Sequence, residues 1–142
     1  MKKIMILMMV MSIILVGCSG DDFDQLKTEE VIESLQKQTI NMNKVVIYNE
    51  NNDPNELLGR QGQYIGKASW TDSRTETNKL NCTIEVFDNE ESLNKRKEYL
   101  KEFTDNPMFN QYVYVHKNII KRINGKLTPS EAKRYKGILK TM

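Results

Sequence analysis

The residues best suited to covalent chemistry in this chain are two cysteines and a single histidine. Cys18 follows a long apolar run, Cys82 lies in an alternating apolar–polar stretch, and His116 lies near two tyrosines. A zinc site or a nucleophile–histidine centre needs several such groups at suitable spacing. His116 has no cysteine or second histidine nearby in the sequence. The sequence therefore predicts no catalytic residues, no metal site, no cofactor and no enzyme.

The surroundings of Cys18 indicate a secretory signal. Lys2 and Lys3 precede an apolar run over 4–16 that contains one polar residue, Ser12, and small residues flank the cysteine. A charged start, a short apolar segment and a small-residue cleavage zone are typical of a signal peptide. A membrane-spanning helix needs about 20 apolar residues, so this run is too short to span.

The residues Leu15, Val16, Gly17 and Cys18 resemble the lipobox of bacterial lipoproteins. The resemblance implies cleavage before Cys18, which then carries a diacylglyceryl group through a thioether and becomes the mature N-terminus. Two acyl chains anchor a protein stably, whereas one binds only marginally. We therefore expect a signal peptide over 1–17 and a lipidated tether over 18–25, reaching roughly 20 Å when extended. The expected location is the extracytoplasmic face of the cell membrane. The alternative is a released protein in which Cys18 is incidental.

Charge excludes one class of partner. The sequence has 21 Lys and Arg residues, of which Lys2 and Lys3 precede Cys18, and 19 Asp and Glu residues, all of which follow it. The mature chain is therefore neutral. Because nucleic-acid binding needs a net basic surface, we expect no nucleic-acid partner.

Hydrophobic periodicity predicts a single α+β domain over 26–142. Strands adjacent in sequence favour an antiparallel sheet of four to five strands with helices packed on one face. Cys82 falls on the apolar side of the expected strand 80–87, which predicts a buried residue rather than a reactive thiol. The predicted helices are 28–38 with Thr28 as its cap, a segment that starts at Asp88, paired with Glu91, and ends at Asn106, and a C-terminal helix capped by Thr128 with Glu131 reaching back. The predicted strands are 45–48, 64–71, 80–87, 111–116 and 119–123, and the last two form a hairpin around Lys117 and Asn118. In strand 64–71, Tyr64 and Trp70 are expected on one face.

A long polar loop before the second expected strand is the strongest candidate for a binding site. The loop and the strand that follows it contain a possible binding rim of basic, amide and aromatic residues: Arg60, Gln61, Gln63, Tyr64 and Trp70. The structural alternative is that Arg60 pairs with Asp72 and holds the loop on the sheet. We favour this structural interpretation.

Several stretches resemble a family of small lipoproteins in low-GC Gram-positive bacteria. The matching stretches are Leu57 to Tyr64, Asp72 to Arg74, Ile84 to Phe87 and Arg96 to Tyr99. The family pattern has proline where this chain has Gln61. The resemblance supports the predicted fold and location and implies no particular activity.

Two hypotheses on function follow. The first is a non-catalytic, membrane-anchored lipoprotein that binds a protein partner, as an envelope accessory or immunity-type module. The alternative is a lipoprotein that binds a small ligand or an ion through the 53–70 loop.

Overall fold

The computed structural model describes residues 23, 25–104 and 106–142 of the 142-residue chain. The order of helices and strands agrees with the sequence prediction. The elements are α1 (Thr28–Gln38), β1 (Met42–Ile47), β2 (Gly66–Asp72), η1 (Ser73–Thr75), β3 (Cys82–Val86), α2 (Glu90–Thr104), η2 (Pro107–Phe109), β4 (Gln111–His116), β5 (Ile119–Asn124) and α3 (Pro129–Leu139).

The five strands form one antiparallel sheet in the order β1-β2-β3-β5-β4. The α+β class and the antiparallel sheet are thereby confirmed. Strands β2, β3 and β5 are central, and β1 and β4 are the edges. Between β2 and β3 the register places Lys67 opposite Glu85 and Ser69 opposite Thr83. The two strands therefore carry matching polar rows on one face of the sheet.

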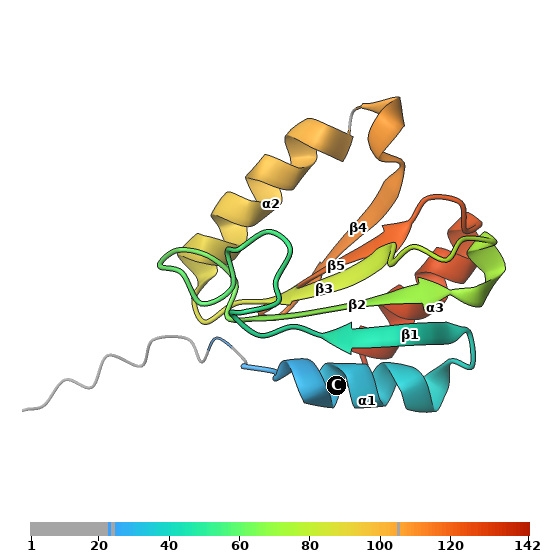
Figure 1. Ribbon diagram of the computed structural model, residues 1–142, viewed down its shortest axis with the longest axis horizontal. Coiled ribbons are helices and arrows are strands. Elements are labelled where there is room, and N and C mark those ends of the chain that lie inside the picture. The colour runs from blue at the N-terminus through green and yellow to red at the C-terminus, as the bar shows by residue number, and fades with distance from the viewer. Residues whose placement is uncertain (1–22, 24, 105) are drawn as a thin grey trace, which may run out of the picture.

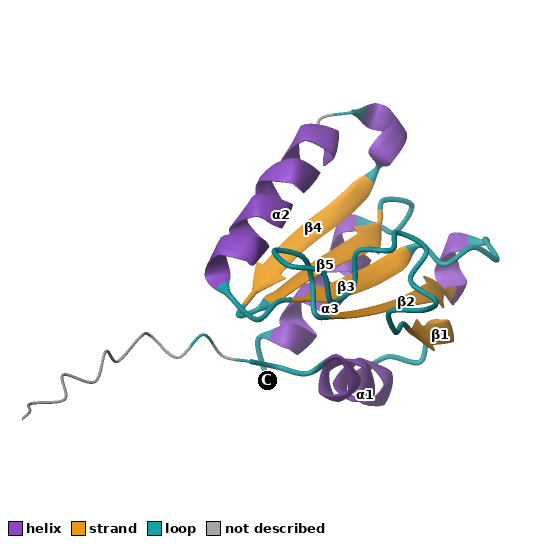
Figure 2. Ribbon diagram, turned by 60° about the vertical axis from the view of Figure 1, so that its left-hand side comes forward, coloured by secondary structure: helices purple, strands orange, loops and turns teal. Residues whose placement is uncertain are grey.

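The helices are divided between the two faces of the sheet (Figures 1 and 2). Helix α1 packs against β2 and β3, and α3 packs against β4 and β5. These two helices cover the same face. Helix α2 contacts β5 from the opposite face, so the prediction that the helices pack on one face holds for α1 and α3 and is wrong for α2. The reason lies in β5, which carries apolar side chains on both faces: Ile119 and Ile123 face α1 and α3, and Ile120 faces α2.

The face covered by α1 and α3 holds the main hydrophobic core, and we call it the apolar face. Trp70 and Ile84 are fully buried there, and the Trp70 indole lies 5.7 Å from the Tyr135 ring. Gly66 allows α1 to approach closely, because a Cβ at this position would collide with Thr28 Oγ1. The rest of this core comes from both helices, three strands and the segment before α3: Val31, Ile32, Leu35, Ala68, Cys82, Val86, Ile119, Ile123, Leu127, Ala132, Ile138 and Leu139.

The opposite face is covered by α2 and by the 48–65 loop, and we call it the charged face. Its hydrophobic cluster is smaller: Tyr64, Phe87, Leu93, Leu100 and Ile120, with Phe23, Leu57, Leu58 and Val113 packed against it. Around this cluster the sheet presents Lys67, Glu85 and Arg122. The charged face therefore combines a small apolar cluster with a layer of ionised groups.

Helix ends follow local sequence signals, with two differences from expectation. Thr128 caps α3, and Glu131 reaches back to it as predicted. In contrast, Lys27 is the N-cap residue of α1, so Thr28 is the first helical residue and is buried against β2. At α2, Asn89 rather than Asp88 accepts a bond from the Ser92 N–H, at 2.8 Å. The side chain one residue later is the one that reaches this amide.

Candidate binding cleft on the charged face

The expected anchor lies outside the described residues. This applies to Leu15, Val16, Gly17 and Cys18, so the lipobox stays a prediction. The described chain enters the domain at Phe23, which packs against the cluster of the charged face. Leu26 then exchanges two hydrogen bonds of 3.0 Å with the side-chain amide of the buried Asn118. The N-terminal segment is therefore fixed to the domain by residue 26.

The predicted rim does not form one surface. Arg60 and Gln61 are exposed in the 48–65 loop, and Gln63 is half-buried. Tyr64 and Trp70 are fully buried, and they belong to the hydrophobic clusters of opposite faces. The expected shared face for Tyr64 and Trp70 fails because β2 begins only at Gly66, after a bend at Ile65 that breaks the alternation.

The expected pairing of Arg60 with Asp72 is also wrong. The Arg60 guanidinium lies 3.9 Å from Glu56, on the protein surface. Asp72 instead accepts two bonds from the Arg74 guanidinium, at 2.6 and 2.9 Å, and one from the Tyr135 hydroxyl at 2.6 Å. Arg74 is two residues along the chain, so it reaches Asp72 without any help from the loop.

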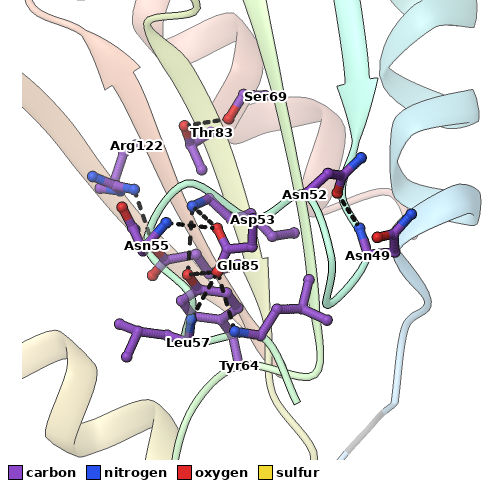
Figure 3. A network of polar contacts seen from close by, with 12 residues as sticks. Asn49, Asn52, Asp53, Asn55, Leu57, Tyr64, Ser69, Thr83, Glu85 and Arg122 are labelled. Carbon is purple, nitrogen blue, oxygen red and sulfur yellow. Dashed lines mark hydrogen bonds and ion pairs between the residues drawn. The ribbon is translucent and has the colours of Figure 1, made fainter. Parts of the chain in front are cut away.

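Asp53 is the residue that holds the loop on the sheet. Its carboxylate is fully buried and bonds to the Lys67 ammonium at 2.6 Å and the Tyr64 hydroxyl at 2.7 Å. Figure 3 shows Asp53, Leu57 and Tyr64 gathered beside Glu85 and Arg122. Both carboxylate oxygens also accept backbone N–H bonds within the loop, from Asn55 at 3.3 Å, Leu57 at 3.0 Å and Leu58 at 3.1 Å.

This environment stabilises the ionised form of Asp53. Burial opposes the charge, but the bonds from Lys67, Tyr64 and the loop backbone outweigh it and hold the pKa of Asp53 well below its usual range. Burial and the neighbouring Asp53 carboxylate raise the pKa of the Tyr64 phenol. Asp53 is therefore a structural anion whose acceptor sites are occupied by the protein itself.

Glu85 forms a second buried ion cluster next to the first. Its carboxylate is fully buried and accepts two bonds from Arg96 of α2, at 2.8 and 2.7 Å, and one from Arg122 of β5, at 3.0 Å. Burial opposes the charge of Arg96, but the bonds and charge of Glu85 prevail and raise the pKa of Arg96. Tyr64 connects the two clusters, since Lys67 and Arg96 lie 5.3 and 5.8 Å from its ring centre.

One positive charge in this layer has no matching carboxylate. Within the part of the chain that the structure describes, Lys67 faces Asp53, whereas both Arg96 and Arg122 face the single carboxylate of Glu85. The Nε of Arg122 is also buried and has no hydrogen-bond acceptor among the described residues. An unpaired buried donor of this kind is uncommon and calls for an explanation.

Arg96 and Arg122 line a cleft of about 360 Å³ between α2, the 48–65 loop and β4. A volume of this size is within the range of ligand-binding sites. Tyr99, Phe103 and Phe109 form an aromatic wall, with ring centres 4.8 and 5.3 Å apart in turn. The remaining lining residues are neutral: Asn55, Leu57, Leu100, Thr104, Gln111 and Val113.

A larger hollow of about 590 Å³ lies between the C-terminal ends of α1 and α3. Its Arg74 is engaged by Asp72 and lies 3.6 Å from Glu131, and Arg134 is exposed. The smaller cleft is the stronger candidate because only there does a buried donor lack an acceptor among the described residues.

The residues singled out for covalent chemistry do not converge. Cys82 is buried on the apolar face as predicted, and burial raises the pKa of its thiol to about 12, so the unreactive thiol form prevails. His116 lies at the end of β4 and pairs in register with Ile119. Across 23, 25–104 and 106–142, no group of three or more His, Cys, Asp or Glu side chains is placed to hold a metal ion.

Sequence reasoning missed the residues of the cleft. The available signal was the polar alternation of Lys67, Ser69 and Thr71, matched by Thr83 and Glu85 in the partner strand. A strand face with polar side chains is normally predicted to be exposed to solvent, but here the 48–65 loop and α2 cover it. A covered polar face requires ionic partners from other elements, and Arg96 and Arg122 supply them.

No protein-family model matches the chain, and no curated protein or solved structure is significantly similar to it.

Proposed function

We propose that this protein is a non-catalytic, lipid-anchored module that binds a protein partner at the extracytoplasmic face of the cell membrane. The observation that supports the anchor is the run of Leu15, Val16 and Gly17 before Cys18, directly after a short apolar segment. Among the described residues, no helix is long and apolar enough to cross a membrane.

The anchor would hold the domain close to the membrane. Phe23 already packs against the domain, and four residues lie between it and Cys18, so the two are five residue steps apart along the chain. That length reaches at most roughly 18 Å when fully extended. A partner of such a module is therefore itself at, in or near the membrane.

The observation that supports partner binding is the cleft between α2, the loop and β4. It combines an aromatic wall with two arginines, and aromatic residues and arginine are enriched where proteins bind one another. Tyr99 and Phe109 are each about half exposed, so they are available for contact. Phe103 lies between them and joins their rings into one surface.

Ion or ligand binding by the 53–70 loop has less support. The loop carboxylate with the most buried position, Asp53, is occupied by Lys67, Tyr64 and three backbone N–H groups. Displacing these donors would release the loop from the sheet. The loop therefore serves the fold in this proposal.

Metabolic labelling with an alkyne fatty acid tests the anchor. We expect the full-length protein to be labelled and to sediment with membranes, and the Cys18→Ala variant to lose both properties. Cys82→Ala is the matched control, because it removes the other cysteine and should retain both. Equal labelling of the wild-type protein and Cys18→Ala would contradict lipidation at this residue.

Site-specific photocrosslinking tests the binding cleft. A photoreactive phenylalanine analogue in place of Tyr99, within the aromatic wall, should capture a partner in intact cells. The same analogue at position 133, on the exposed side of α3, is the control and should capture much less. Equal crosslinking from both positions, or none from position 99, would argue against the cleft as the docking site.

A further inference from the structure

We propose that the cleft recognises an acidic segment of the partner protein, in which one carboxylate lies next to an apolar side chain. This inference rests on the proposed partner binding and adds the chemistry of the contact. In it, the carboxylate accepts a hydrogen bond from the guanidinium of Arg122, and the apolar side chain packs against Phe103 and Phe109.

The net positive charge of the buried layer beside the cleft determines the sign of the charge that a ligand should carry. The buried layer contains three cations, Lys67, Arg96 and Arg122, and two carboxylates, Asp53 and Glu85. None of the described residues that line the cleft is acidic. One negative charge therefore completes the layer. A carboxylate supplies one negative charge and so matches the one excess positive charge of the layer. A phosphate monoester supplies about 1.5 to 2 negative charges, which is about twice that excess.

The available donor determines where this charge binds. Arg96 directs its Nε and Nη2 at Glu85, at 2.8 and 2.7 Å. Arg122 uses only Nη2 for the same carboxylate, at 3.0 Å, and its buried Nε has no acceptor among the described residues. Leaving such a donor unpaired is unfavourable. The Nε itself is enclosed, but 18% of the Arg122 side chain is exposed and lines the cleft, so a ligand carboxylate can form a charge-assisted hydrogen bond with the guanidinium there. Arg122 is therefore the specific contact, and Arg96 positions Glu85.

The size of the exposed apolar surface indicates a polypeptide rather than a small molecule. The cleft itself accommodates one or two side chains. Beyond it, Met108 is 87% exposed beside Phe109, and Tyr99 and Phe109 are each about half exposed. A ligand confined to the cleft would leave these residues in water, whereas an extended segment would cover them.

A peptide array tests this inference directly. The probes are acetylated, amidated pentapeptides with Asp or Glu next to Leu or Phe, and the matched probes carry Asn or Gln at the acidic position. Full-length protein in detergent micelles should bind acidic members at least about tenfold more tightly than their amide counterparts, because a charge-assisted bond is lost in the latter. Sodium benzoate, a small apolar carboxylate, should bind much more weakly than the best peptide.

Arginine variants locate the contact. Arg122→Gln should lose the preference for acidic peptides, and Arg122→Lys should retain part of it. Arg134→Gln, which removes an exposed arginine on α3, should bind like the wild-type protein. The side-chain Nε–H resonance of Arg122 should shift on peptide addition, and thermal unfolding of each variant checks that the fold is retained.

Three results would overturn the inference: equal binding of acidic and amide peptides, an unchanged preference in Arg122→Gln, or benzoate binding as tightly as the peptides. Failure to bind any array member would also count against it. These outcomes are distinct from failure of the proposed function. A partner that crosslinks from position 99 without any carboxylate dependence would leave partner binding in place and remove only the acidic segment.

Discussion

The two faces of the sheet are built from the same strands but are stabilised in different ways. On the apolar face, Trp70 and Ile84 pack against α1 and α3, and the buried ammonium group of Lys121 donates to the Tyr135 carbonyl. On the charged face, Lys67 and Glu85 occupy the neighbouring positions of the same two strands, and their partners come from the loop and α2. Because successive side chains of a strand point to opposite faces of the sheet, the same two strands supply apolar packing on one face and ion pairs on the other.

The difference indicates which face carries the stability and which one carries the binding site. Burial of large apolar side chains is the main favourable contribution to folding. Buried ion pairs contribute little net stability, because desolvation offsets their attraction, but the loss of one partner is strongly destabilising. We infer that the apolar face stabilises the fold and that the charged face fixes the loop and α2 around the cleft.

Loss of Trp70 should have the largest effect on stability. Trp70→Ala removes a fully buried indole from the apolar face and should lower the free energy of unfolding by about 3–5 kcal/mol. Urea denaturation followed by circular dichroism measures it. Tyr99→Ala on α2 is the aromatic control, and because this side chain is half exposed its loss should be below about 1 kcal/mol. A small effect of Trp70→Ala would show that the apolar face is not the main source of stability.

The charged face should respond asymmetrically to removal of Asp53 and Lys67. Asp53→Ala leaves the Lys67 ammonium buried without a carboxylate and removes the acceptor of three loop amides, so we expect a loss of about 3 kcal/mol or slightly more. Lys67→Met should cost clearly less, because Asp53 retains the Tyr64 hydroxyl and the loop amides. Urea denaturation and limited proteolysis of the loop check both.

The contrast between these two variants is the informative result. In Asp53→Ala the 48–65 loop should be cleaved faster under native conditions, because the amides of Asn55, Leu57 and Leu58 lose their acceptor. Equal stability losses and equal cleavage in the two variants would mean that the ion pair itself, rather than the carboxylate and its amides, holds the loop.

The apolar face was largely predictable from the sequence, and the charged face was not. Helix 28–38 and the hairpin around Lys117 followed from periodicity and turn residues, which are local signals. The order of the strands in the sheet and the separate face for α2 depend on long-range packing. Alternation shows that Ile120 and Ile123 point to opposite sides, but it does not show which helix covers each side.

The candidate site was missed for a related physical reason. Its arginines lie in two elements, α2 and β5, and they meet only because the buried carboxylate of Glu85 attracts both. No spacing along the chain records that convergence. The predicted rim groups residues that are close in sequence, but two of them, Tyr64 and Trp70, lie in separate hydrophobic clusters on opposite faces of the sheet.

Lys121 is a pH-dependent group on the apolar face. Burial lowers the pKa of this ammonium to about 7, whereas its ordinary value is about 10.5. Between pH 7 and about 10.5, Lys121 holds its proton in the unfolded chain and has lost it in the folded protein, so the free energy of unfolding rises with pH. The slope is at most about 1.4 kcal/mol per pH unit. Above pH 9 the buried Cys82 thiol, whose pKa burial raises to about 12, opposes this trend.

Urea denaturation at pH 7, 8 and 9 tests this expectation. Lys121→Met should be more stable than the wild-type protein at pH 7 and should lose most of the rise between pH 7 and 9. The exposed Lys133→Met is the control and should keep the wild-type slope. The same slope in Lys121→Met and in the wild-type protein would assign the pH dependence to other groups.

The smallest effect on stability is expected for the loss of Arg122. A comparison with the loss of Arg96 shows whether Arg122 is needed for the fold or is available to a ligand. Arg96→Gln removes two bonds from the fully buried Glu85 and should cost about 3 kcal/mol. Arg122→Gln removes one bond, but it also removes an unmatched charge and a buried Nε–H without an acceptor among the described residues, so its cost should stay below about 1 kcal/mol. Urea denaturation of both variants decides between these expectations. If Arg122→Gln is as destabilising as Arg96→Gln, both arginines are structural, and the charged face holds no spare donor for a partner.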